Sequence, residues 1–220
     1  MNELSERAIE ILVEIGALRF GDFTLKSGRT SPYFVNIGDV ADGAGISALG
    51  EILAEKIASE LCVGDYDVLF GPAYKGIVLA AATSLSLYSF FGINLPFAYD
   101  RKEKKAHGEG GSFVGVGLDR PDSRVLLLDD VITDGGTKIE AVTRIGEETG
   151  AKVTGMLVVV DRMEKDDTGA LYSARIERET GVPVHSLATL VDIVEYIEAR
   201  GPELLGIDQD VFATLKKRLS

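Results

Sequence analysis

The stretch VLLLDDVITDGGT, residues 125–137, constrains the fold more than any other part of the chain. It begins with the apolar run Val125–Leu128, which is typical of a parallel strand buried on both faces. Two carboxylates, Asp129 and Asp130, follow where this strand is expected to end. A glycine-bearing loop and then a helical pattern come next. This order predicts a site for a phosphorylated sugar, because N–H groups at a helix start bind phosphate and glycines let the backbone approach it closely.

Other interpretations of this stretch fit the residues less well. A Walker loop needs Gly-x-x-x-x-Gly-Lys-Ser/Thr, whereas the order here is Gly135-Gly136-Thr137-Lys138 with no earlier glycine at the required spacing. The dinucleotide fingerprint Gly-x-Gly-x-x-Gly is also absent from this loop. An ordinary buried strand with a tight turn is the remaining alternative. It leaves two adjacent carboxylates at the strand tip without a reason, and such charges are costly without partners.

Outside this stretch, the hydrophobic patterns alternate between strands and helices. We expect strands at Val68–Phe70, Pro96–Tyr99, Val125–Asp129, Val153–Val160 and Val184–Leu187, and helices at residues 4–15, 45–61, 77–91, 137–149, 170–180, 190–200 and 208–219. This alternation predicts an α/β fold with a mainly parallel sheet covered by helices on both faces. Ligands of such sheets bind at the carboxyl ends of the strands, where the acid pair is expected.

The segment Phe20–Gly38 has a different pattern, in which apolar and polar residues alternate between glycines and a proline. This pattern predicts short strands and turns rather than a strand–helix–strand unit. We therefore expect one domain over residues 1–220. It comprises a small N-terminal hood subdomain at about residues 1–40, joined by the C-terminal helix, and an α/β core at about residues 41–200.

Composition limits the partners and the location. A net charge of −12 argues against a nucleic-acid partner, which usually needs a broad basic surface. The uncharged run Gly76–Tyr99 is long enough to span a membrane, but its polar residues and Pro96 divide it into a helix, a turn and a strand. We expect its helix to pack beneath the sheet, and no membrane partner. The single cysteine, Cys62, cannot form an internal disulfide, and we expect it to pack as a small apolar side chain on a helix. Without a leader pattern at the start, a cytoplasmic protein is expected.

Two further segments have features of an anion site. The turn Gly71-Pro72-Ala73-Tyr74-Lys75-Gly76 lies between an expected strand and an expected helix, so its N–H groups converge and Lys75 adds positive charge. A turn with a solvated lysine is the alternative. The segment RKEKKAHGEGG, residues 101–111, combines cations with glycines inside an acidic chain. Taken alone, it is equally typical of a solvated charged loop.

Together these motifs resemble those of the type I phosphoribosyltransferases. Residues 125–137 resemble the family's signature for phosphoribosyl diphosphate (PRPP), and LKSGRTSPYF and RKEKKAHGEGG resemble segments of its orotate phosphoribosyltransferase branch. The resemblance covers nearly the whole chain. It implies the type I phosphoribosyltransferase fold, a twisted, mainly parallel sheet with a small hood. It also implies transfer of the 5-phosphoribosyl group from PRPP to orotate in pyrimidine (UMP) synthesis, giving orotidine 5′-monophosphate and diphosphate.

The resemblance also implies which residues bind PRPP. They come from the diphosphate turn, the basic loop and the signature stretch: Tyr74, Lys75, Arg101, Lys102, Lys105, His107, Asp129, Asp130, Val131, Ile132, Thr133, Asp134, Gly135, Gly136 and Thr137. Catalysis is expected from four of them in the basic loop, with Lys105 as the key cation, His107 as a proton donor to the diphosphate, and Arg101 and Lys102 beside them. Lys104 is the alternative to Lys105. Asp134 departs from the family pattern, which more often has a small or neutral residue there. Its charge opposes phosphate binding unless the side chain points into solvent, as we expect.

The residues that the resemblance assigns to orotate are Lys26, Phe34, Val35, Thr133 and Arg162. Arg162 is expected to clamp the carboxylate of the base, which a guanidinium can bind through two parallel hydrogen bonds. The alternative for Arg162 is a surface ion pair with Asp161 or Glu164. Mg²⁺ is the implied cofactor, held through the substrate and water, with Asp129 or Asp130 as the candidates for a direct contact. A homodimer that shares its active sites across the interface is also implied.

Two other functions share part of this pattern. A phosphoribosyltransferase for a purine or another base would need residues 129–137 but not Lys26, Arg162 or the HGEGG loop. A PRPP-sensing regulator of the same fold could keep the phosphate loop, but it would more often carry a basic nucleic-acid surface or an added binding domain. The acidic charge and the length of the chain disfavour this second alternative.

Overall fold

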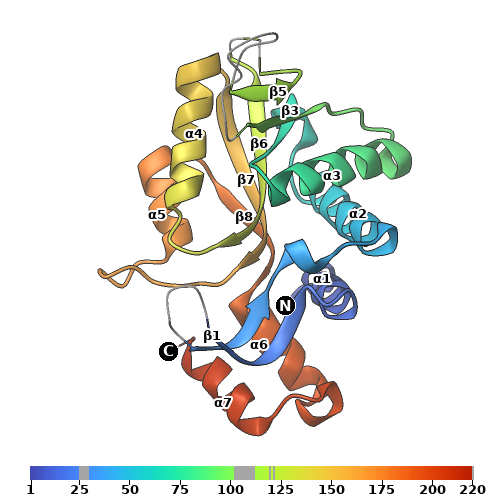
Figure 1. Ribbon diagram of the computed structural model, residues 1–220, viewed down its shortest axis with the longest axis vertical. Helices are drawn as coiled ribbons and strands as arrows, with labels where there is room; N and C mark the ends of the chain where they lie inside the picture. The colour runs from blue at the N-terminus through green and yellow to red at the C-terminus, as the bar shows by residue number, and fades with distance from the viewer. Residues whose placement is uncertain (25–29, 102–111, 119, 121, 220) are drawn as a thin grey trace.

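The computed structural model describes residues 1–24, 30–101, 112–118, 120 and 122–219. Its centre is a six-stranded sheet with the strand order β5-β4-β3-β6-β7-β8 (Figure 1). The strands are β3 (Val68–Gly71), β4 (Phe97–Asp100), β5 (Phe113–Gly115), β6 (Arg124–Ile132), β7 (Lys152–Asp161) and β8 (Val184–Thr189). All neighbours pair in parallel except β5, which runs antiparallel to β4. The predicted α/β class and mainly parallel sheet are therefore confirmed.

Helices cover both faces of this sheet. Helices α2 (Gly43–Ser59) and α3 (Lys75–Phe91) lie on one side, and α4 (Gly136–Thr149) and α5 (Tyr172–Thr180) lie on the other (Figure 1). The apolar run of β6 serves both sides, because Leu126 and Leu128 join one buried cluster while Val125 and Leu127 join the other. This alternation is the reason why the run is apolar at every position.

A second, two-stranded antiparallel sheet of β1 (Leu18–Thr24) and β2 (Thr30–Val35) is separate from the main sheet. Helix α7 (Gln209–Lys217) contacts both strands, so the two ends of the chain meet in this region (Figure 1). Helices α1 (Glu3–Glu14) and α6 (Leu190–Arg200) also contact one another and strand β8. We propose that residues 1–40 and the C-terminal helix form the hood, with the core at 41–200. Short 3₁₀ helices at Ile37–Asp39, Val63–Asp65 and Glu203–Leu205 complete the described elements.

Three details differ from the sequence predictions. Strand β5 was not predicted, because its three residues follow a glycine-rich segment and are too few to show a period. Helix α3 is not buried all round, since Leu85, Tyr88 and Phe90 on it are more than 60% exposed. Cys62 is exposed in the turn after α2 rather than packed on a helix.

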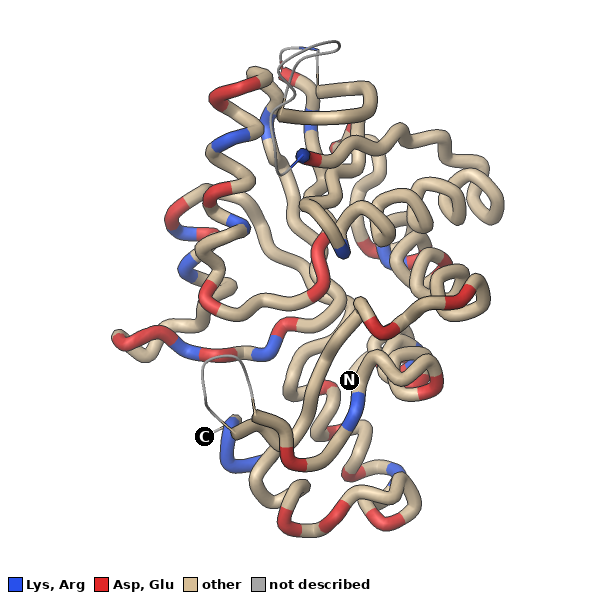
Figure 2. The backbone as a smooth tube through the Cα atoms, in the orientation of Figure 1, with Lys and Arg blue, Asp and Glu red and all other residues tan. Residues whose placement is uncertain are grey.

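Charged residues lie mainly around the outside of the chain, whereas the acidic segment near the end of β6 lies in the middle of the view (Figure 2). Within the described ranges, no helix is both long and apolar enough to cross a membrane.

Candidate active site

The acid pair lies inside strand β6. The strand continues to Ile132, so the prediction that it ends at Asp129 is wrong. Pairing between β6 and β7 extends as far as Ile132 and Asp161, and this ladder keeps the chain extended past both acids. Because successive side chains of a strand point to opposite faces, Asp129 and Asp130 face different helices.

Each acid of the pair forms an ion pair with a different lysine. The Nζ atom of Lys138, in the first turn of α4, lies 2.6 Å from Oδ2 of Asp129. The Nζ atom of Lys75, at the start of α3, lies 2.6 Å from Oδ2 of Asp130. Burial raises the pKa of the Asp129 carboxyl above its usual value, and the positive charge of Lys138 opposes this shift. The charges of both acids are therefore compensated, and the Lys75 pair also brings the diphosphate turn to the acid pair.

The loop after β6 is the proposed phosphate cradle, and its backbone is tightly constrained. Gly135 has a φ angle of +75°, in the left-handed region, and a Cβ there would lie 2.8 Å from the side chain of Ile176. A glycine is therefore required at this position. Thr133, Gly136 and Thr137 are exposed. Among the described residues, the N–H groups of Gly135 and Thr137 find no acceptor, so both are available to phosphate oxygens.

The side chain of Asp134 does not point away from this loop. Its Oδ1 atom accepts a hydrogen bond from the N–H of Gly136 at 3.0 Å, although the residue is exposed. Asp134 is therefore exposed to solvent, as expected, but its side chain also turns back onto the loop. Its carboxylate occupies one N–H group at the helix start and places a negative charge beside the cradle.

The proposed diphosphate turn closes tightly between β3 and α3. A Cβ on Gly71 would lie 1.9 Å from the carbonyl oxygen of Gly76, so the turn has no room for a larger residue. The N–H of Ala73 donates to Oδ1 of Asp100 at 2.6 Å, which ties the turn to the end of β4. Tyr74 is 66% exposed at its outer edge.

Arg101 is the one predicted catalytic residue that the structure describes. It follows β4, and its N–H donates to the carbonyl of Ser112 at 2.7 Å, so the two ends of the basic loop are joined. Lys102, Lys105 and His107 lie outside the described residues, as does Lys26 in the hood.

Arg162 follows β7 and is buried. Its Nη2 atom lies 3.1 Å from Oε1 of Glu164, so the alternative ion-pair partner is present, but this pair is buried rather than at the surface. The same Nη2 atom lies 3.4 Å from Oγ of Ser31, and the guanidinium carbon lies 5.1 Å from the centre of the Tyr33 ring. These contacts join the end of β7 to the hood. Burial raises the pKa of Tyr33, and Arg162 opposes that shift.

The sheet places Thr133 and Arg162 at the ends of adjacent strands, because Ile132 pairs with Asp161 immediately before them. Nε of Arg162 is buried and finds no hydrogen-bond partner in the described part of the chain. A buried donor in this state is costly, and an anionic ligand would satisfy it. A cavity of about 150 Å³ adjoins it, lined by Arg162, Met163, Glu164, Lys165, Leu190 and Arg218.

The two hood residues assigned to the base are neighbours in β2. Phe34 is half-buried and stacks on Phe23 with ring centres 5.5 Å apart, whereas Val35 is buried. The side-chain contacts of Arg162 described above go to Ser31 and Tyr33 instead. Phe34 and Val35 are therefore in the expected strand, and their contact with a base stays a prediction.

Comparison with known proteins agrees with this arrangement. Residues 38–169 match the family model described as "Phosphoribosyl transferase domain". An orotate phosphoribosyltransferase from Bifidobacterium adolescentis is 45% identical over 199 residues, which cover 87% of this chain and 85% of the relative. The chain belongs to the orotate phosphoribosyltransferase family. A relative of the same name from Pseudomonas fluorescens is 44% identical over 190 residues, covering 86% of each chain.

A solved structure supports the same membership. The crystal structure of an orotate phosphoribosyltransferase from Francisella tularensis superposes with a TM-score of 0.78 at 36% identity, covering 95% of each chain. The predicted type I phosphoribosyltransferase fold and the predicted enzyme class, a glycosyltransferase that transfers phosphoribosyl groups, are both confirmed.

Sequence reasoning missed three residues that shape this site. Lys138 compensates Asp129, Asp100 holds the diphosphate turn, and Ser31 contacts Arg162. A lysine in the first turn of a helix is a visible signal, because its charge opposes the helix dipole. No comparable signal marks Asp100 or Ser31, whose partners lie 27 and 131 residues away along the chain.

Proposed function

We propose that this protein transfers the 5-phosphoribosyl group of PRPP to orotate, giving orotidine 5′-monophosphate and diphosphate in UMP synthesis. The observation that carries the proposal is the ion pair of Lys75 with Asp130, which brings the diphosphate turn to the acid pair beside the phosphate cradle. The three segments that we assign to PRPP therefore lie together at the carboxyl ends of the strands, which supports the proposal. The names of the relatives, at 44–45% identity, support orotate as the base.

In this reaction a ring nitrogen of orotate forms a bond to C1 of the ribose and gives up its proton to solvent, while the bond from C1 to the diphosphate oxygen breaks with its electron pair leaving on diphosphate. The cradle at Gly135 to Thr137 holds the 5′-phosphate, and Asp129 and Asp130 accept hydrogen bonds from the ribose hydroxyls. Lys75 and the cations of the basic loop, Arg101, Lys102, Lys105 and His107, stabilise the departing anion. Holding both reactants in line lowers the barrier further.

Arg162 binds the carboxylate of orotate in this proposal. Its buried Nε lacks a partner within the described residues, and the adjoining cavity is open to a ligand. Thr133, on the adjacent strand end, lies between the base and the cradle. Lys26, with the backbone of Phe34 and Val35, covers the base from the hood.

Mg²⁺ is the proposed cofactor. In the described parts of the chain, no group of three or more His, Cys, Asp or Glu residues comes together, and Asp129 and Asp130 each already have a lysine at 2.6 Å. Paired carboxylates of this kind fit a metal held mainly by substrate and water oxygens, which Mg²⁺ prefers. When bound there, the ion would supply positive charge beside the diphosphate.

The direct test mixes the protein with orotate, PRPP and Mg²⁺ and follows the loss of orotate absorbance. We expect turnover with orotate and none above background with hypoxanthine or uracil. Turnover with hypoxanthine but not orotate would favour a purine enzyme. PRPP binding without turnover on any base would favour a PRPP-sensing protein. Omitting Mg²⁺ and adding a chelator tests the metal.

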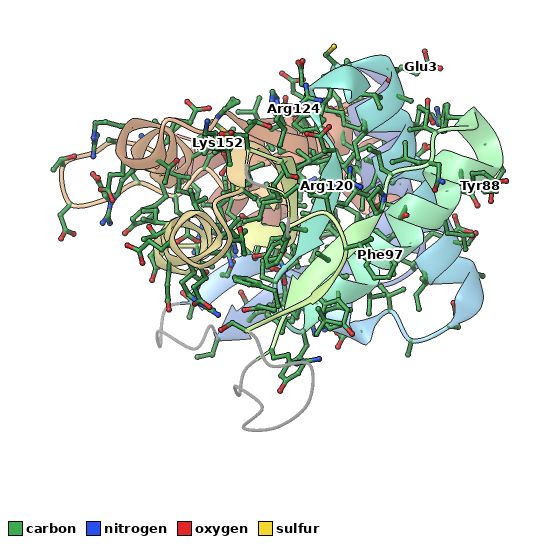
Figure 3. All side chains as sticks on the ribbon, turned by 90° about the horizontal axis from the view of Figure 1, so that it is seen from above. Glu3, Tyr88, Phe97, Arg120, Arg124 and Lys152 are labelled. Carbon is green, nitrogen blue, oxygen red and sulfur yellow. The ribbon has the colours of Figure 1, made fainter. Side chains whose placement is uncertain are left out.

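We also propose a cytoplasmic homodimer with shared active sites and no nucleic-acid or membrane partner. Helix α3 supports the dimer, because it exposes five apolar side chains: Val78, Leu85, Tyr88, Phe90 and Phe91, at 42–66% exposure. Figure 3 shows Tyr88 at the outer edge of the molecule. An apolar patch of this kind indicates a protein interface. Val78 lies one turn after Lys75, so a second copy that covers this whole helix would extend to the diphosphate turn at its start.

Two experiments test the dimer. Light scattering should give twice the chain mass, and Phe90→Glu should give the monomer mass, whereas Leu204→Glu, at an exposed position on the 3₁₀ helix Glu203–Leu205, should not. Mixing inactive Lys105→Ala with inactive Asp130→Asn should restore up to about a quarter of the activity if each loop serves its neighbour's site, because random pairing leaves that share of sites intact. A monomer, or no recovery, would contradict the proposal.

A further inference from the structure

Lys138 occupies a position that is unfavourable for a lysine. It lies in the first turn of α4, and its side chain is 7% exposed, with Nζ 2.6 Å from Oδ2 of Asp129, which is 13% exposed. The N-terminus of a helix carries partial positive charge, so a cation is disfavoured there. Burying an ion pair also costs desolvation that its own attraction often fails to recover. Stability alone therefore does not account for this lysine.

The two acids are held in the same way but by different lysines. Each carboxylate accepts at both of its oxygens. Oδ1 of Asp129 accepts from the N–H of Asp130 at 2.9 Å, and Oδ1 of Asp130 accepts from the N–H of Val131 at 2.8 Å. Each Oδ2 atom accepts a lysine. The difference is exposure, because the side chain of Lys75 on Asp130 is 41% exposed whereas that of Lys138 is buried.

Because of this difference in exposure, we expect the two ion pairs to respond differently when a ligand binds. Lys75 is long, exposed and attached to the diphosphate turn, so it can leave Asp130 for a phosphate oxygen. Lys138 is buried in the first turn of α4 with its Nζ atom on Asp129 of β6, so it stays on Asp129. A carboxylate fixed at both oxygens keeps one orientation, and an acceptor already oriented spends less free energy when it binds a hydroxyl.

We propose that Lys138 is a positioning residue that holds Asp129 as the fixed acceptor for a ribose hydroxyl, while Asp130 exchanges its lysine on ligand binding. The inference rests on the proposed function, since it assigns PRPP to this site. The sequence assigns the binding of ribose hydroxyls to both acids alike, whereas this inference gives Asp129 and Asp130 different roles.

Isothermal titration calorimetry of Lys138→Met with PRPP and Mg²⁺ tests it. We expect the Kd for PRPP to rise at least about tenfold, because a freed Asp129 must be oriented by the ligand. The KM for orotate should stay within about threefold, since Arg162 is untouched. The matched control is Lys56→Met, which removes another buried lysine, paired with Glu60 at 2.5 Å on α2, and should leave PRPP binding unchanged.

A double-mutant cycle distinguishes an effect of Lys138 through Asp129 from a general loss of structure. If Lys138 acts through Asp129, then Lys138→Met should weaken PRPP binding less than about twofold in the Asp129→Asn background. The double variant removes both buried charges, so it should fold even where the single variant does not. The full loss in both backgrounds, or Lys138→Met binding PRPP like the wild type, would overturn the inference but leave the proposed function intact. Wild-type protein that does not bind PRPP would overturn both.

Discussion

Arg162 and Glu164 form a buried ion pair, with Nη2 and Oε1 3.1 Å apart, on either side of a residue in the left-handed region. Met163 between them has a φ angle of +53°, and its N–H donates to Oδ1 of Asp161 at 2.8 Å. This turn brings both charged side chains to the cavity beside the hood. Glu164 compensates the charge of the guanidinium, and within the described ranges Nε has no hydrogen-bond partner.

Replacing Arg162 by lysine should therefore affect orotate selectively. A lysine keeps the charge but cannot form two parallel hydrogen bonds, so we expect the KM for orotate to rise at least about tenfold and that for PRPP less than about threefold. Steady-state kinetics with each substrate varied in turn measure both. Arg175→Lys, at a surface pair with Glu179, is the matched control. Equal effects on the two substrates would count against Arg162 as the clamp.

Lys105 is the predicted key cation of the basic loop. We expect Lys105→Ala to lower kcat by at least ~10²-fold, as for a lost contact made in the transition state, with an unchanged Tm. Lys104→Ala is the neighbouring control and should retain most of its turnover. The reverse result, with Lys104→Ala inactive and Lys105→Ala active, would transfer the role to Lys104.

Asp134 places a negative charge beside the phosphate cradle. Asp134→Asn keeps an oxygen that can accept from Gly136 but removes the charge, so the Kd for PRPP should fall by about threefold to tenfold at low salt. The gain should shrink as salt increases, because the charge is exposed. The control is Asp208→Asn. Asp208 accepts from the N–H of Asp210 in the same way but far along the chain, so this variant should leave the Kd for PRPP unchanged. Weaker PRPP binding by Asp134→Asn would show that the carboxylate supports the cradle.

Gly71 tests the tightness of the diphosphate turn. A Cβ there would lie 1.9 Å from the carbonyl oxygen of Gly76, so Gly71→Ala must displace the backbone. We expect the free energy of unfolding to fall by about 1–3 kcal/mol and PRPP binding to weaken. Gly43→Ala, at the start of α2 with no heavy atom within 4 Å of the added methyl group, should be neutral or slightly stabilising. Urea unfolding and PRPP titration measure the two effects. A stable, binding-competent Gly71→Ala would show that the turn can open.

The ion pair of Asp67 with Arg124 lies at the amino ends of strands β3 and β6, opposite the acid pair. It should make the stability of the fold depend on pH. Hydrogen bonds from Arg124, at 3.0 Å from Nε and 2.8 Å from Nη2, lower the pKa of Asp67 from 3.8 to about 2. Figure 3 shows Arg124 beside Lys152, its partner in the β6–β7 register. Because the folded-state pKa is the lower one, the pair stabilises the fold above about pH 4 and loses this effect as the pH falls through about 2.

Asp67→Asn should accordingly lower the Tm by only about 2 °C at pH 7, since the pair is exposed, and the difference from wild type should disappear by about pH 2. Asp22→Asn removes the same charge from an exposed position in β1 and should show no such pH dependence. A difference between Asp67→Asn and wild type that grows on acidification would contradict the assigned direction.

The sequence by itself determined the alternation of the longer strands and helices, the glycine loop after β6 and the adjacent acid pair, because each depends on residues close together in the chain. The apolar run of β6 requires burial on both faces, and Gly135 permits a backbone turn that other residues strain. Family membership also follows from these local motifs, as the relatives confirm.

Tertiary structure alone decided which charges meet. Lys75 and Asp130 are 55 residues apart, and Arg162 and Ser31 are 131 apart, so no local pattern can pair them. The end of β6 was also set by its neighbour, because pairing with β7 carries the strand past both acids to Ile132. Ion pairs and strand ends depend on the free energy of burial in the assembled sheet, and that free energy is defined only when distant segments are in contact.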